Sequence, residues 1–148
     1  MRRRWLLLGC VGMAWLGACG AGEEDLSAAC TERAGVERAL AAAPEPVRLA
    51  DGTSIARCIA DAGTPGLLQS LGATLTPIAE DLEARAASDP AAAMRLGYLI
   101  GAARRGSARS DGLGAEIVRR LERSGGEVRD PGMTGELLRG IRAGEETG

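Results

Sequence analysis

The sequence predicts an all-α protein, a small bundle of five or six short helices with a core of leucine, isoleucine and alanine. Alanine, leucine and arginine are abundant and β-branched residues are sparse, which favours helix. Proline and glycine divide the chain into segments of helical length. No run of alternating apolar and polar residues is long enough to predict a strand.

Proline delimits most helices of the first half. The first runs from about 25 to 43 and stops before Pro44-Glu45-Pro46, a turn or extended connector, and the second runs from about 53 to 62. Thr64-Pro65 begins the third, because a capping threonine before a proline at the first helical position is a common start. Pro77 is expected to restart or kink this helix, since proline removes a helical hydrogen bond and crowds the preceding turn.

The second half contains three further predicted helices. The fourth spans 89–106 and repeats apolar residues at the i, i+3, i+4, i+7 spacing of a helix face. The fifth spans roughly 111–123, with Leu113 on its apolar side, and a weaker sixth opens at Asp130-Pro131. We expect residues 144–148 to form a disordered tail. Because helix pairs recur, a short α-solenoid is an alternative, although no fixed period with matching residues is visible.

An export signal stands at the start of the chain. Arg2-Arg3-Arg4 precedes an apolar run of fourteen residues, which is shorter than the roughly 20 that a transmembrane helix needs. The run ends in Leu16-Gly17-Ala18-Cys19, which resembles the lipobox of bacterial lipoproteins. That resemblance implies that Cys19 receives a diacylglycerol and becomes the first residue after the signal peptide is cut. A second candidate, Leu7-Leu8-Gly9-Cys10, has too few apolar residues before it.

The resemblance also divides the chain and implies where the protein resides. It implies a cleaved signal peptide at 1–18, a lipidated flexible tether at 19–24 and a helical domain at 25–143. The protein is then exported and held at the cell membrane by the lipid on Cys19. Gly20 stands where an aspartate is associated with retention at the inner membrane, so the periplasmic side of an outer membrane is favoured. The basic start loosely resembles a twin-arginine signal, and an ordinary secreted protein is the alternative reading.

Composition excludes several kinds of site. Without the signal peptide, fifteen arginines face twenty acidic residues, a net charge of −5, and Tyr98 is the only aromatic residue. Surfaces that stack sugars or nucleic-acid bases depend on aromatic side chains, so we expect no nucleic-acid partner. The chain has no histidine, which excludes haem ligation and zinc sites built on that residue. We expect neither a metal nor another cofactor.

Two cysteines remain after the signal peptide and Cys19 are set aside. Cys30 and Cys58 each lie on an apolar stripe, and a helical hairpin turning at 44–46 would bring them together. Disulfides persist in the compartments that exported proteins reach, so we predict a structural Cys30–Cys58 disulfide. Two buried free thiols are the alternative. A redox role is disfavoured, because there is no Cys-x-x-Cys motif and no histidine to activate a thiolate.

Charge is unevenly spread along the chain. Residues 19–94 carry a net charge of −7 and residues 95–142 a net charge of +4. Some charges can pair along the fifth helix, as Glu116–Arg120, Arg119–Glu122 and Arg123–Glu127. The arginines without such a partner form a candidate anion-binding surface: Arg95, Arg104, Arg105 and Arg109. Solvated helix faces with internal pairing are the alternative.

Three functions fit these observations. The first is a membrane-anchored, non-catalytic module that contacts other proteins of the envelope or serves a structural role. The second is a lipoprotein that binds a lipid or small apolar ligand between its helices. The third is a peptidoglycan hydrolase that uses two carboxylates, for which Glu80 and Glu83 are the candidates. The shortage of aromatic residues argues against a sugar cleft, so we expect no catalysis.

Overall fold

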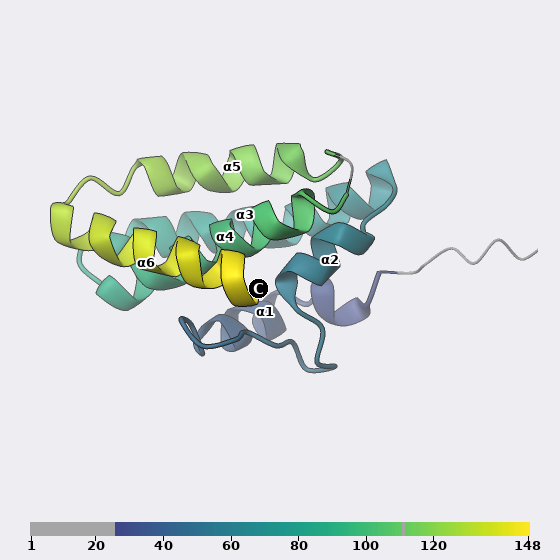
Figure 1. Ribbon diagram of the computed structural model, residues 1–148, viewed down its shortest axis with the longest axis horizontal. Helices are drawn as coiled ribbons and strands as arrows, with labels where there is room; N and C mark the ends of the chain where they lie inside the picture. The colour runs from purple at the N-terminus through teal and green to yellow at the C-terminus, as the bar shows by residue number, and fades with distance from the viewer. Residues whose placement is uncertain (1–25, 111) are drawn as a thin grey trace, which may run out of the picture.

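Four helices that alternate in direction, α3 to α6, make up the main bundle, and η1, α1 and α2 pack against it (Figure 1). The computed structural model describes residues 26–110 and 112–148, so the predicted signal peptide, Cys19 and the tether lie outside the described residues. Within the described residues the protein is all-α, with six α-helices and no strand, as predicted. The elements are η1 Ala28–Cys30, α1 Arg33–Leu40, α2 Ile55–Asp61, α3 Pro65–Ala86, α4 Pro90–Ser107, α5 Ala115–Gly126 and α6 Pro131–Thr147.

Capped prolines start the three longest helices. Thr64 accepts a hydrogen bond from the Leu67 amide at 3.3 Å, and Asp89 accepts one from the Ala91 amide at 2.9 Å. Asp130 accepts from two amides at the start of α6. Each cap is followed by a proline whose missing N–H costs nothing at this position. These three predicted helix starts are confirmed.

Helix α3 runs through Pro77 as one α-helix, so the predicted restart is wrong. The residues beyond the proline, Ile78 and Leu82, are buried in the same core as Leu71 and Leu75 before it. Burying a leucine or isoleucine side chain contributes about 1.5–3 kcal/mol each, which together exceeds the roughly 3 kcal/mol that an interior proline costs. Tertiary packing on both sides of Pro77 therefore keeps the helix continuous.

Glycines allow α4 and α6 to pack backbone against backbone. At four glycines a Cβ atom would overlap a carbonyl oxygen of the facing helix. The overlaps are Gly97 with Leu137, Gly101 with Ile141, Gly140 with Met94 and Gly144 with Tyr98. Small residues spaced by four let two helices approach this closely. Because α4 is buried along nearly its whole length, this contact forms the centre of the fold.

The end of α6 corrects the prediction of a disordered tail. The helix continues to Thr147, because Gly144 lies against α4 and the Thr147 hydroxyl lies 3.0 Å from the Tyr98 hydroxyl. The same buried Tyr98 hydroxyl accepts a hydrogen bond from the Val47 amide at 3.0 Å. The single aromatic side chain of the helical domain therefore ties α4 to both the connector after α1 and the end of α6.

Two other predicted helices have different limits in the structure. The segment predicted as one helix over 25–43 forms two helices, η1 and α1, which are separated by Thr31 and Glu32. The Thr31 carbonyl instead accepts a hydrogen bond from the Thr74 hydroxyl of α3 at 3.3 Å. The fifth helix begins at Ala115, not 111, and Leu113 lies in the turn before it. None of the helices described between 26 and 148 is both long and apolar enough to be a membrane span.

Candidate functional site

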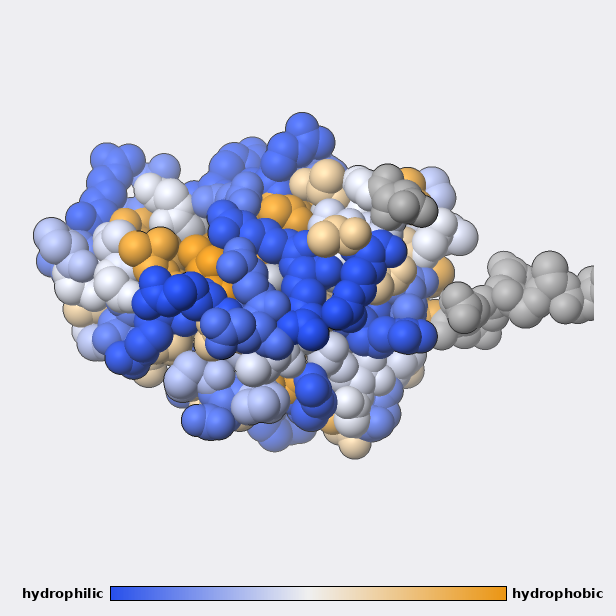
Figure 2. Space-filling view, viewed as in Figure 1, coloured by the Kyte–Doolittle hydropathy of each residue, from blue (hydrophilic) through white to orange (hydrophobic). Residues whose placement is uncertain are grey.

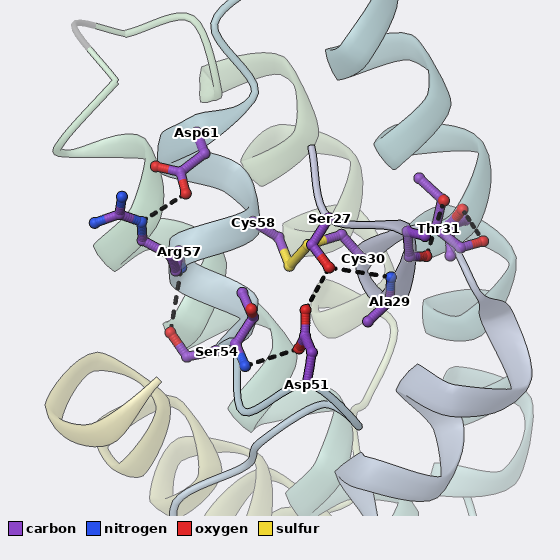
Figure 3. Close-up of a disulfide and its surroundings, with 12 residues drawn as sticks. Ser27, Ala29, Cys30, Thr31, Asp51, Ser54, Arg57, Cys58 and Asp61 are labelled. Carbon is purple, nitrogen blue, oxygen red and sulfur yellow. Dashed lines mark hydrogen bonds and ion pairs between the residues drawn. A yellow bond between two sulfur atoms is a disulfide. The ribbon is translucent and has the colours of Figure 1, made fainter. Parts of the chain in front are cut away.

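The predicted disulfide is confirmed: Cys30 of η1 is bonded to Cys58 of α2 (Figure 3). The Cα atoms of the two cysteines are 5.7 Å apart, and both side chains are buried. The bond joins segments separated by 28 positions and closes the loop that contains α1 and the connector after it. The first segment of the described chain is therefore covalently attached to the core.

Hydrogen bonds at the surface also attach Ser27, just before Cys30, to the loop before α2. The Ser27 hydroxyl donates a hydrogen bond to the Asp51 carboxylate and accepts one from the Ala29 amide at 3.2 Å (Figure 3). The Thr53 amide donates to the other Asp51 oxygen at 2.9 Å. The hydrogen bonds from Ser27 and then Thr53 favour the ionised carboxylate, so they hold the pKa of Asp51 below its ordinary value. Asp51 thus links the residues before Cys30 to the turn before α2.

Asp51 is expected to make stability depend on pH in the acid range. Because its pKa is lower in the folded state, its stabilising effect is complete above the unfolded pKa near 3.8 and is lost as the pH falls through the folded pKa. We expect Asp51→Asn to unfold at lower urea concentration than wild type at pH 7, with the difference shrinking below about pH 4. Urea titrations followed by circular dichroism would measure this. A difference that stays constant down to pH 2 would show that the Asp51 charge contributes nothing.

Arg104 forms two ion pairs, which corrects the prediction that this arginine of the candidate anion-binding surface has no partner. Its guanidinium pairs with Glu122 of α5 at 2.8 Å and with Glu145 of α6 at 3.2 Å. Partial burial lowers the pKa of Arg104, but the hydrogen bonds to both carboxylates outweigh it and the net shift is upward. Arg104 therefore connects three helices. Its pairing with Glu122 also replaces the predicted Arg119–Glu122 pair, and Arg119 contacts Glu116 instead.

Arg105 stabilises the end of α6. Its Nη1 donates to the backbone carbonyls of Glu145, at 2.8 Å, and of Glu146. Arg48 donates to the Thr147 carbonyl at 3.4 Å. The last carbonyls of a helix lack partners within the helix and carry partial negative charge, so cations there satisfy both needs. Two arginines thus supply the end of α6 with hydrogen bonds that its own sequence does not provide.

The remaining two predicted arginines lie apart from each other. Arg95 is half-buried and lines a groove of about 490 Å³ between α1, α3 and α4, whose floor contains Leu40, Ile78 and Leu82. Arg109 is exposed in the turn after α4. The four predicted arginines therefore do not form one surface.

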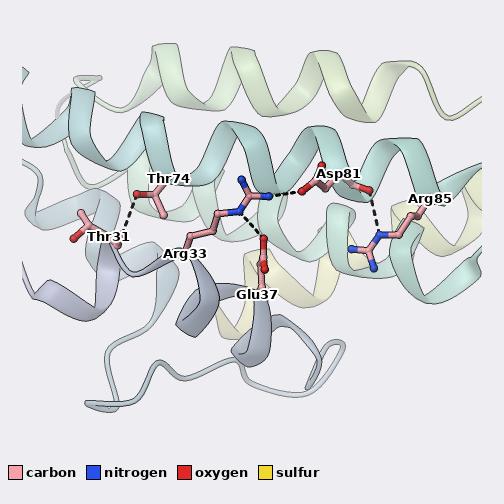
Figure 4. A network of polar contacts seen from close by, with 6 residues as sticks. All are labelled: Thr31, Arg33, Glu37, Thr74, Asp81 and Arg85. Atoms are coloured by element: carbon pink, nitrogen blue, oxygen red, sulfur yellow. Dashed lines mark hydrogen bonds and ion pairs between the residues drawn. The ribbon is translucent and has the colours of Figure 1, made fainter.

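An ion pair between α1 and α3 lies at the rim of the Arg95 groove (Figure 4). Arg33 donates to Glu37 at 2.7 Å and also to Asp81 across the groove. Arg85 donates to the Asp81 carbonyl at 3.2 Å. These contacts engage Glu37, Asp81 and Arg85, which are most of the polar side chains that line the groove. The rest of the lining is mainly apolar.

Glu80 and Glu83 lie on a second groove, of about 430 Å³, between α3 and α5. Glu80 is exposed and Glu83 is half-buried, and every side chain lining this groove is polar. Glu116, across the groove, has its pKa lowered by the hydrogen bond from Arg120 and by the charge of Arg119. A glycosidase acid needs the opposite, a raised pKa. The groove therefore has an all-polar lining with the Glu116–Arg120 ion pair on its α5 side.

A third groove, of about 290 Å³, lies between the start of α3 and the start of α5. Its apolar lining includes Pro65, Leu68, Leu113 and Ile117. Leu113 is 50% exposed and Leu138, in the middle of α6, is 49% exposed. The exposure of Leu113 is not apparent from the sequence, in which the residue falls on the apolar side of the predicted fifth helix.

The face shown in Figure 2 is mostly hydrophilic. Hydrophobic residues gather there in small patches along the line between α5 and α6, and charged residues cover the areas around them. No protein-family model, curated protein or solved structure matches the chain. The function is therefore argued from the residues and their contacts alone.

Proposed function

We propose that the chain is a lipid-anchored protein of the bacterial envelope whose helical domain is a non-catalytic interaction or structural module. The observation that carries the proposal is Leu16-Gly17-Ala18-Cys19 at the end of a short apolar run, in the position of a lipobox. The Cys30–Cys58 disulfide supports export, because disulfides persist in oxidising compartments and are rare in the cytosol.

The anchor has a simple energetic basis. Each buried CH₂ of an acyl chain contributes about 0.8 kcal/mol, so one chain binds reversibly and two or more give stable attachment. A diacylglycerol on the Cys19 thiol supplies two chains. Cys30 follows eleven positions later, so the disulfide would join the anchored segment to the folded domain.

A non-catalytic role is supported by what the charged side chains do. Arg104 pairs with Glu122 of α5 and Glu145 of α6, Arg105 binds carbonyls at the end of α6, and Arg33 bridges α1 and α3. Tyr98, the residue most suited to bind a ring, is buried and hydrogen-bonded. These groups hold helices together, which suits a rigid module displayed from a membrane.

Lipid labelling of cysteine variants tests the anchor. We expect the wild-type protein, expressed with a clickable fatty acid, to carry the label and to fractionate with membranes. Cys19→Ala should abolish both, because it removes the thiol that the lipid would occupy. Cys10→Ala is the matched control and should change neither. Label retained in Cys19→Ala, or an intact mass without added lipid, would overturn the proposal.

Crosslinking in intact envelopes tests the interaction role. The chain has no lysine, so a carboxyl-reactive reagent is needed. We expect an adduct of defined mass with the wild-type protein and its loss with Cys19→Ala, which separates the domain from the membrane. A wild-type protein that remains uncrosslinked over a wide range of reagent would contradict an interaction role and leave only a structural one.

A further inference from the structure

The apolar groove between α3 and α5 contains a large side chain that the fold leaves half-uncovered. Leu113 is 50% exposed, and Pro65 and the half-buried Leu68 line the groove beside it. Ile117 is buried beneath them. We name Pro65, Leu68 and Leu113 the apolar end patch.

The described chain begins at the same end of the bundle as this patch. In Figure 1 the first described residues, the start of α3 and the turn between α4 and α5 all lie at one end of the longest axis. The turns between α3 and α4 and between α5 and α6 lie at the opposite end. Since α3 has 22 residues, the two ends are separated by about 33 Å of helix.

The length of chain before Leu26 limits where a membrane could meet the domain. Leu26 lies seven positions after Cys19, and a fully extended chain spans at most roughly 25 Å over that length. The lipid anchor therefore keeps the end that carries the patch within reach of the bilayer surface. The opposite end lies farther from Leu26, by about the length of α3.

Ion pairs engage part of the described charge at this end, and the half-exposed leucine is the feature suited to an apolar contact. Arg57 pairs with Asp61, and Arg120 pairs with Glu116 at the side of the groove. Arg109 is the exposed cation nearby in the sequence. Leucine side chains on a polar background enter the boundary between headgroups and acyl chains, and their binding depends on buried apolar area.

We propose that the apolar end patch docks the helical domain onto the lipid surface that receives the Cys19 anchor, with Leu113 in the headgroup–acyl boundary. This inference rests on the proposed lipid anchor. It sets the orientation of the domain, with the patch against the membrane and the turns at 87–89 and 127–130 directed away from it.

A single tryptophan reports this contact, because the sequence after the signal peptide contains none. Leu113→Trp places the probe in the patch, and Leu138→Trp is the matched control, since Leu138 is 49% exposed on α6. Tryptophan prefers membrane interfaces wherever it is placed, so the comparison between the two variants removes that bias. Both are purified with their lipid from cells that express the full chain and are reconstituted into phosphatidylethanolamine–phosphatidylglycerol vesicles.

We expect the Leu113→Trp variant to show blue-shifted emission, quenching by brominated lipids and protection from aqueous iodide. The Leu138→Trp variant should keep an emission maximum typical of water and be quenched by iodide. Because the contact is apolar, raising the salt concentration should leave both results unchanged.

An intact mass, measured first, distinguishes failure of the lipid anchor from failure of the docking. A mass without lipid overturns the proposed function and this inference with it. A lipidated protein whose two variants give the same spectra and quenching overturns only the docking. Shielding of the Leu113→Trp probe in native envelope membranes but not in pure lipid vesicles would assign the patch to a protein partner and also overturn lipid docking.

Discussion

Gly140→Ala is expected to destabilise the protein by about 3 kcal/mol, at the upper end of the usual cost of overpacking a core. A Cβ atom at position 140 would overlap the Met94 carbonyl and lie 2.8 Å from the Tyr98 amide nitrogen. Both obstacles are backbone atoms of α4, so no side-chain rotation can relieve them. The helices must separate, which loosens the packing of α6 on the most buried helix of the bundle.

Gly135→Ala is the matched control on the same helix. A Cβ atom there would meet nothing within 4 Å, and alanine is favoured over glycine in a helix by about 1 kcal/mol. We therefore expect Gly135→Ala to raise the free energy of unfolding while Gly140→Ala lowers it. Urea unfolding followed by circular dichroism measures both. Equal effects of the two substitutions would show that α4 and α6 are not in backbone contact.

Loss of the Cys30–Cys58 disulfide is expected to lower the free energy of unfolding by about 3.5 kcal/mol. The bond closes a loop between residues 28 positions apart, and the chain-entropy argument gives this cost for a loop of that length. The Cys30→Ala/Cys58→Ala double variant should therefore unfold at clearly lower urea concentration. The effect is large against the roughly 5–15 kcal/mol by which small domains are stable.

Reductant supplies an independent check on the same bond. Dithiothreitol should shift the unfolding midpoint of the wild-type protein toward that of the double variant and leave the double variant unchanged. If the oxidised wild type and the double variant unfold at the same urea concentration, the disulfide does not stabilise the fold. The single cysteine replacements are less informative, since each leaves a free thiol able to pair with another molecule.

Features encoded by neighbouring residues were predictable. The starts at Thr64-Pro65, Asp89-Pro90 and Asp130-Pro131 depend on a side chain reaching an amide two or three residues away. The disulfide was also predictable, because only two cysteines remained and a hairpin would bring their stripes together. In each case the interaction is local, or the choice of partners is small enough for the sequence to decide it.

The partners of the charged residues could not be predicted in the same way. Glu116 pairs with Arg120 within α5 as expected, but Glu122 turns to Arg104 of α4. Arg105 was expected to be free and instead caps α6. Pairs within one exposed helix contribute only about 0.2–0.5 kcal/mol, so a nearby residue of another helix easily replaces them. For this reason Arg104 and Arg105, expected to be unpaired, have partners on neighbouring helices.

The helical class, the capped starts, the cysteine pair and the apolar run before Cys19 are all readable in the sequence. Each of these depends on composition or on residues a few positions apart. Three features required the folded structure: α3 passes through Pro77, α6 extends to Thr147 and Leu113 remains half-exposed. Those outcomes depend on which helices meet and how closely, and glycines such as Gly101 and Gly140 set that distance only after the chain has folded.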